Sequence, residues 1–228
     1  MRRYFYAIIV IVMSLCFGNS MAQTHYTSRV SLGVKGGLEL SRIFFNPSVK
    51  QSFATGATAG ITFRYIEESH FGLIAELNFA QRGWKENFED APYNYRHTIN
   101  YLEIPLLAHI YFGSRGHFFF NAGPQIGFKI GNSVSANFNP AEAGSLPSFP
   151  QDKLNTEEMT MDINQKIDFG ISAGLGGEFF IKPHQSLYAE CRFYYGLGNV
   201  LKSGRGEPFS SSNSMALSVT LGYWFRIK

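Results

Sequence analysis

The chain has 228 residues, of which 45% are hydrophobic, and it carries 20 basic and 17 acidic residues. This length fits a single domain, and the near-neutral charge argues against nucleic acid as a partner. Its two cysteines are Cys16 and Cys191. Because Cys16 falls in a segment that we expect to be removed, the remaining thiol has no internal partner, which excludes a disulfide-stapled exported domain.

The first 22 residues have the pattern of a secretory signal peptide. Arg2 and Arg3 precede an apolar stretch over 4–17, and the small-x-small sequence Ser20-Met21-Ala22 follows. The apolar stretch is several residues shorter than the about 20 that a membrane-spanning helix needs. We therefore expect a signal peptide over 1–22 and a mature domain over 23–228. Its removal lowers the basic count from 20 to 18 against 17 acidic residues, a net charge of +1.

Beyond the signal peptide, apolar and polar residues alternate with period two in segment after segment, which predicts β-strands. In the first segment, Leu32 and Val34 share the apolar parity while Lys35 and Glu39 share the polar one. In the fourth, Pro105 predicts a bulge. The eight predicted strands cover 29–41, 57–65, 73–82, 99–111, 118–130, 167–179, 187–195 and 217–225.

The connections between these strands alternate strictly between short and long. The short ones cover 67–70, 113–117 and 182–185, and the long ones cover 42–53, 83–97, 131–166 and 198–214. Transmembrane barrels show this asymmetry, with short periplasmic turns and long extracellular loops. Alternation alone would also fit a soluble β-sandwich. The connections favour an all-β fold, an eight-stranded antiparallel transmembrane β-barrel.

Charged residues occur on the polar parity of every predicted strand except the last, and across the strands the two signs balance. In a narrow barrel they would face a lumen just wide enough for side chains, where unpaired charges are costly and opposite charges pair. In a soluble protein the same residues would form an ordinary solvated face. The predicted lumen charge network comprises Arg29, Lys35, Glu39, Arg64, Glu76, Arg82, Glu103, Lys129, Asp168, Glu178, Glu190 and Arg192.

Aromatic residues gather near the ends of the predicted strands. Such positions are typical of the interfacial girdles of membrane barrels, although core packing would also explain individual rings. The predicted girdle residues are Tyr65, Phe79, Tyr111, Phe118, Phe128, Phe179, Tyr195, Tyr223 and Phe225.

Several phrases resemble one known family. They are LIAELNFAQRG at 73–83, YLEIPLL at 101–107, NAGPQIG at 121–127, IDFG at 167–170, YYGLGNV at 194–200 and the closing strand at 217–225. Together they resemble the PorT-type outer-membrane β-barrel proteins, often labelled porin family and common in Bacteroidetes. The resemblance implies an eight-stranded barrel in the bacterial outer membrane, with a final strand read by the outer-membrane assembly machinery. It brings no catalytic residues, and some relatives assist protein secretion to the cell surface.

No residue pattern indicates catalytic, cofactor-binding or metal-binding chemistry. His97 with Asp90 is the only rim pairing that a surface enzyme could use, and a solvated loop pair explains it better. Glu157 and Glu158 are adjacent, which also favours solvation over a carboxylate pair. The 131–166 loop is long enough to be functional or disordered. It is the preferred contact for an extracellular or secretion partner, and a mobile solvated loop is the alternative.

Three functions therefore remain open. The first is a non-enzymatic barrel with a structural or surface-binding role, which includes a role in secretion. Its surroundings would be outer-membrane lipid and lipopolysaccharide. The second is porin-like passive transport of small solutes. The third and weakest is a surface enzyme at the rim.

Overall fold

A computed structural model describes residues 28–88, 91–147, 149, 156–163, 165–204 and 206–227. The predicted signal peptide lies outside these residues and stays a prediction. Within them, the chain forms nine strands and two short 3-10 helices. The elements are β1 (Arg29–Asn46), β2 (Gln51–Ser52), β3 (Ala54–Ile66), β4 (Phe71–Glu86), β5 (Tyr95–Phe112), β6 (Gly116–Ala136), η1 (Pro140–Ser145), η2 (Glu157–Met159), β7 (Ile167–Lys182), β8 (Gln185–Asn199) and β9 (Ser211–Arg226).

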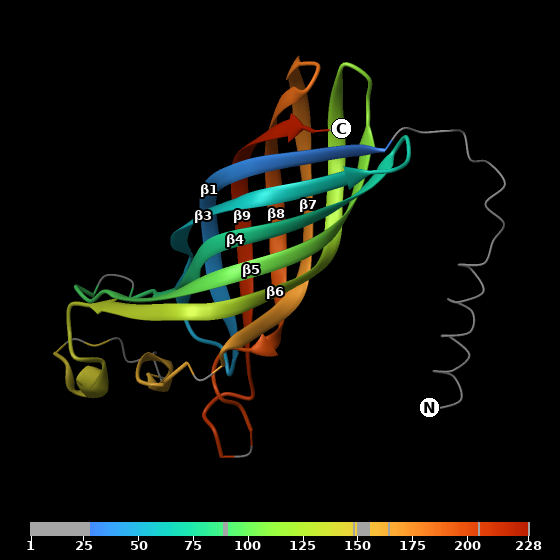
Figure 1. The fold of residues 1–228 in the computed structure, drawn as a ribbon. Helices are drawn as coiled ribbons and strands as arrows, with labels where there is room; N and C mark the ends of the chain where they lie inside the picture. The colour runs from blue at the N-terminus through green and yellow to red at the C-terminus, as the bar shows by residue number, and fades with distance from the viewer. Residues whose placement is uncertain are drawn as a thin grey trace, which may run out of the picture.

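The eight long strands close into a ring (Figure 1). Each pairs antiparallel with its neighbours along the chain, and the ring closes where β1 pairs with β9 from Ser31↔Arg226 to Asn46↔Ser211. The short strand β2 pairs with the end of β4, among the long connections. Closure leaves the ring without free edges, so backbone donors find partners on both sides of each strand. The predicted eight-stranded antiparallel barrel is confirmed.

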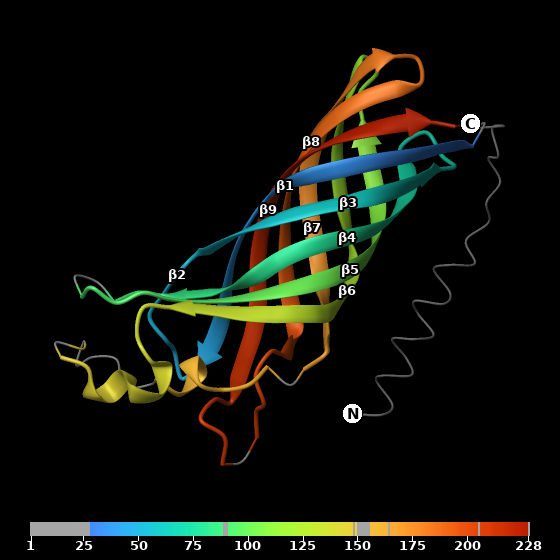
Figure 2. The same cartoon turned by 60° about the vertical axis from the view of Figure 1, so that its left-hand side comes forward.

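All three short turns lie at one end of the barrel and the long connections lie at the other (Figure 2). The strands are longer than predicted, because pairing continues past the apolar segments toward the long-loop end. For example, β6 reaches Ala136, so the connection predicted over 131–166 begins six residues later than expected. No helix within the described part of the chain has the length and apolar character to cross a membrane.

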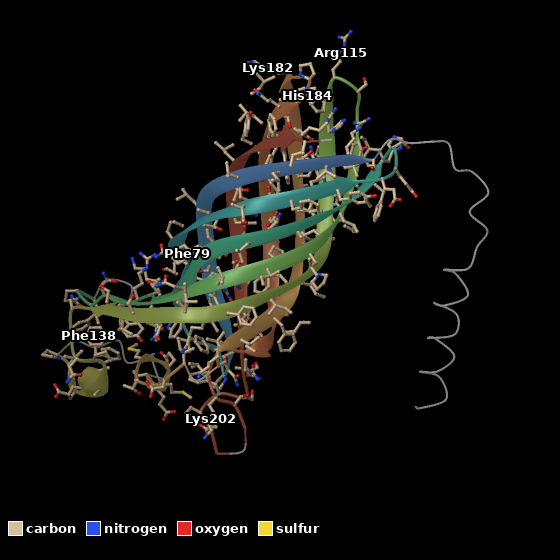
Figure 3. The ribbon with its side chains drawn as sticks, in the orientation of Figure 1. Phe79, Arg115, Phe138, Lys182, His184 and Lys202 are labelled. Carbon is tan, nitrogen blue, oxygen red and sulfur yellow. The ribbon has the colours of Figure 1, made fainter. Side chains whose placement is uncertain are left out.

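The two faces of the sheet differ as the alternation predicts. Polar residues such as Ser31 and Glu39 are 2% and 4% exposed inside the ring, whereas Leu221 and Leu38 are 70% and 63% exposed on its outer surface. The inner face is therefore polar and the outer face apolar, the reverse of a soluble sandwich. Figure 3 labels Phe79, one of these outward residues, on the side of the barrel.

Two sequence predictions about residues of β5 are wrong. Pro105 pairs with Gln125 in unbroken register, and the shift lies instead between Asn100 and Tyr101. A proline lacks one backbone donor but adds no residue, so it need not shift the register. The predicted girdle residue Tyr111 points inward and is 3% exposed, because it shares the inward parity of its strand.

Glycines of the inward parity leave space inside the narrow barrel. A Cβ at Gly176 would overlap both the carbonyl oxygen of Ala189 and the ring of Phe119. The side chain of Phe119 thus occupies the volume that any larger residue at 176 would need.

Candidate functional site

The barrel interior holds three groups of ion pairs, stacked from the short-turn end to the long-loop end. The first, the inner cluster, joins Arg64 and Glu178. Arg64 donates from both terminal nitrogens to Glu178 at 2.6 and 2.9 Å, and Ser186 donates to the same carboxylate at 2.5 Å. The Arg64 guanidinium also lies 4.6 Å from the ring centroid of Trp224. The inner cluster therefore holds a charged pair against the Trp224 ring.

The central cluster contains two cations and two carboxylates. Arg192 donates two hydrogen bonds to Glu76, at 2.7 and 2.8 Å, and further bonds to Glu190 on its own strand. Lys35 reaches Glu76 from the other side, with its Nζ 2.7 Å from Oε2. Since these side chains are at most 6% exposed, each charge depends on the others for its compensation.

The outer ion cluster is built around Arg82. Its Nη1 lies 3.2 Å from Asp168, its Nε lies 3.5 Å from Glu39, and its Nη2 contacts Glu103. The guanidinium also packs against the rings of Tyr194 and Tyr101, at 4.1 and 4.9 Å from their centroids. One cation thus forms ion pairs with three buried carboxylates, each on a different strand.

The structure brings ten of the twelve predicted charged residues into these three clusters and places the other two elsewhere. Arg29 lies at the short-turn mouth. Lys129 lies near the opposite end, where its ammonium donates to the backbone carbonyl of Ile163. Whether the network has a functional role beyond stability stays a prediction.

Neutral polar residues link the charged clusters, and the charge-based prediction missed them. Asn121 donates to Glu190 at 2.8 Å, and its Oδ1 lies 2.7 Å from His109 Nδ1. Gln125 donates to Glu103 at 2.9 Å and accepts from Ser172 at 2.6 Å. All of these residues lie on the inward parity. Their polar character at inward positions was the sequence signal that could have placed them in the lumen network.

Little space remains between these side chains. A cavity of about 20 Å³ lies between the central and outer clusters, beside Lys35, Glu39 and Arg192. A second, of about 10 Å³, lies beside Arg64 and Trp224. Cavities of this size hold about one water molecule each. The interior is therefore filled at these levels, as expected for an eight-stranded barrel.

At the long-loop end, strand extensions and loops share a buried hydrophobic cluster, which we call the mouth cluster. It was not predicted, because its members lie far apart in the sequence. Trp84 is fully buried at its centre, with its ring 4.5 Å from His97 and 5.7 Å from Phe45. The buried members are Ile43, Phe45, Trp84, Phe88, Tyr95, Ile99, Tyr101, Ala143, Met159, Ile163, Val200, Leu201 and Phe209.

The model of the family described as "Outer membrane protein beta-barrel domain" matches residues 21–202. This match covers more than half of the chain. The chain belongs to the outer membrane protein β-barrel family. Its location is therefore the outer membrane, where the apolar outer face of the ring contacts lipid, the short turns face the periplasm and the long loops face outward.

Solved structures similar to this outer membrane β-barrel include three bacterial proteins. Neisserial surface protein A is 15% identical with a TM-score of 0.44, covering 88% of this chain and 99% of that one. OprG from Pseudomonas aeruginosa is 11% identical with a TM-score of 0.48, covering 86% and 95%. Ail of Yersinia pestis, in complex with a heparin analogue, is 12% identical with a TM-score of 0.42, covering 86% and 99%. No curated protein matches the sequence.

In this outer membrane β-barrel, the described part of the 131–166 segment packs onto the mouth cluster. Tyr95 donates from its hydroxyl to the carbonyl of Met159 at 3.0 Å. Glu158, predicted to be solvated, is instead 0% exposed, because η2 turns it toward the barrel. The described residues around Met159 and Ile163 are thus held against the barrel by Tyr95 and Lys129.

His97, the described member of the predicted rim pair, is buried rather than solvated in a loop as predicted. It is 3% exposed and stacked on Trp84, with its Nε2 3.2 Å from the amide nitrogen of Asn132. Its inward orientation follows from the parity of β5. Asp90 lies outside the described residues. No group of three or more potential metal ligands occurs in the part of the chain that the structure describes.

Proposed function

We propose that this protein is a rigid, non-enzymatic outer-membrane barrel that presents its extracellular loops to a surface partner. The filled interior carries the proposal: only about 20 Å³ is open beside Lys35, Glu39 and Arg192, less than a hydrated solute requires. Passive transport of small solutes would need a continuous aqueous path at this level.

The proposed domain organisation is a cleaved signal peptide over 1–22 and a barrel over 23–228.

The packing of the loops supports the surface-binding part of the proposal. Tyr93, Phe138 and Phe149 pack around Phe88, with centroid distances of 6.1, 5.6 and 5.8 Å. Tyr93 also donates to the carbonyl of Pro147 at 2.5 Å. A loop assembly held in one conformation binds a partner with a smaller loss of conformational entropy than a mobile loop. The exposed residues of η1 stand on this assembly.

The proposed partners follow from location and from the resemblance to PorT-type proteins. Lipopolysaccharide surrounds the long-loop end, the assembly machinery recognises β9, and an extracellular or secretion partner contacts the segment 131–166. For that last partner, η1 offers the exposed carboxylate of Glu142. We place the protein in a secretion-related role on this basis.

Planar bilayer recordings test the filled lumen. Wild-type protein is expected to show no reproducible unit conductance. The double variant Glu76→Ala/Arg192→Ala removes a mutually compensating pair from the central cluster and is expected to open a measurable conductance, which shows that the assay detects a barrel of this size. Reproducible unit conductance of the wild type would instead favour transport.

A strain that lacks this protein tests the secretion role. Wild-type protein should restore surface secretion, whereas Glu142→Lys should reduce it while the barrel still folds. Arg115→Glu reverses an exposed charge at the periplasmic end and serves as the matched control. Equal secretion with and without the protein would refute this role.

A further inference from the structure

The periplasmic end of the barrel contains a cavity of about 610 Å³ that the lumen network does not use. It lies where the three short turns meet the first and last strands. Ser69 and Ser114 come from two of the turns, Lys182 ends β7 beside the third, and Arg29 and Arg226 come from the ends of β1 and β9. Residues that are far apart in the sequence thus converge on one opening because the ring closes there.

The lining of this periplasmic cavity is positively charged. Arg29, Lys182 and Arg226 contribute permanent cations and Ser69 and Ser114 contribute hydroxyl groups, while none of the described residues that line it is acidic. Figure 3 labels Arg115 and His184 at the same end of the barrel as Lys182. Such a concentration of one sign in a concave site attracts anions.

The floor of the cavity is closed and electrically compensated. Tyr111 is 3% exposed there and donates to the carbonyl of Glu68 at 3.1 Å. His117 lies 3.3 Å from Glu178, whose charge is already balanced by Arg64 at 2.6 Å. The Glu178 carboxylate behind the floor is therefore already paired within the inner cluster.

The backbone holds the two terminal strand ends in place. The amide of Arg226 donates to the carbonyl of His184 at 2.8 Å, and the amide of Ile227 donates to the carbonyl of Val30 at 2.7 Å. These bonds tie the last strand to the β7–β8 turn and to β1. The backbone that carries Arg226 is therefore fixed, which lowers the entropic cost of binding a ligand there.

One wall of the cavity is apolar. Phe180 and Ile181 line it, and Ile181 is 55% exposed on the outer face of β7. The cavity thus connects the basic residues at the periplasmic opening with the edge of the lipid-facing surface. The geometry points to a binding site for a phosphate group, held by Arg29, Lys182 and Arg226 through charge-assisted hydrogen bonds. The phosphate belongs either to a lipid headgroup of the periplasmic leaflet or to a free phosphate ion.

Two measurements on the full barrel in an uncharged detergent test this site and distinguish its two sources. In the first, inorganic phosphate is titrated while amide NMR shifts are recorded at the short turns. In the second, phosphatidylglycerol is added and native mass spectrometry counts the retained lipid, with and without excess inorganic phosphate. If the amide shifts at the turns saturate with inorganic phosphate, a free phosphate ion is sufficient for binding. If phosphatidylglycerol stays bound in excess inorganic phosphate, the ligand is the lipid headgroup.

The variants Lys182→Gln and Arg226→Gln should each weaken the observed binding about tenfold, the effect of losing one charge-assisted contact. Lys202→Gln removes an exposed cation from an extracellular loop and should leave binding unchanged. If Arg226→Gln does not fold, Lys182→Gln still decides, because the Lys182 side chain is exposed at the end of β7. The proposal is overturned if neither phosphate nor lipid binds, or if the Lys182→Gln protein binds like the wild type.

Discussion

Replacing Arg82 with methionine removes the cation that Glu39, Glu103 and Asp168 share, without leaving a large void. Arg82 is 2% exposed, and the three carboxylates are at most 5% exposed, so water compensates little of the lost charge. Breaking a buried ion pair by removing one partner costs about 3–5 kcal/mol. The loss of contacts to the rings of Tyr101 and Tyr194 acts in the same direction.

The free energy of unfolding in phospholipid vesicles, from urea titration followed by gel mobility, measures this effect. Lys202→Met removes an exposed cation, 68% exposed and 2.7 Å from Glu207, and should change stability by less than about 1 kcal/mol. A quadruple variant that adds Glu39→Gln, Glu103→Gln and Asp168→Asn should recover much of the loss. A cost below about 1 kcal/mol for Arg82→Met alone would refute the assignment of three dependent carboxylates to this cation.

Three further predictions concern other parts of the barrel. Trp84→Ala, at the centre of the mouth cluster, should lower the free energy of unfolding by about 3–5 kcal/mol and expose the extracellular loops to protease; unchanged protease resistance would argue against a packed mouth. Val219→Arg, in the middle of β9 on the lipid-facing side, should cost about 2–4 kcal/mol in vesicles, whereas Phe225→Arg near the strand end should cost about 0–1 kcal/mol, and equal costs would contradict the proposed membrane depth. Gly176→Val should cost about 1–3 kcal/mol because Phe119 fills its space, while Gly144→Val in η1, where nothing lies within 4 Å, should be tolerated in the same urea titration.

The barrel could be predicted from the sequence because one physical rule governs most of it. Period-two alternation assigns each side chain to lipid or lumen, so Lys35 and Leu32 fall on opposite faces without any knowledge of their neighbours. Connection lengths then indicate which end faces the periplasm. The inward direction of Tyr111 follows from the same parity and was missed only because its position near a strand end was given more weight.

The ends of the strands and the mouth could not be predicted in this way. The continuation of β6 to Ala136 depends on pairing with β5, which adds hydrogen bonds beyond the apolar segment. The burial of Glu158 and the stacking of His97 on Trp84 depend on contacts between loops that alternation does not describe. Which cation meets which carboxylate is likewise set by register and strand tilt, so Arg82 reaches Asp168 across 86 residues of sequence.

Cell fractionation combined with heat-modifiable gel mobility tests the central claim most directly, because it reports membrane location and barrel closure together. We predict that the mature protein is recovered in the outer-membrane fraction and that the unheated form migrates differently from the boiled form. Recovery as a water-soluble monomer without detergent, with the same mobility before and after heating, would contradict a closed barrel with an apolar outer face in lipid.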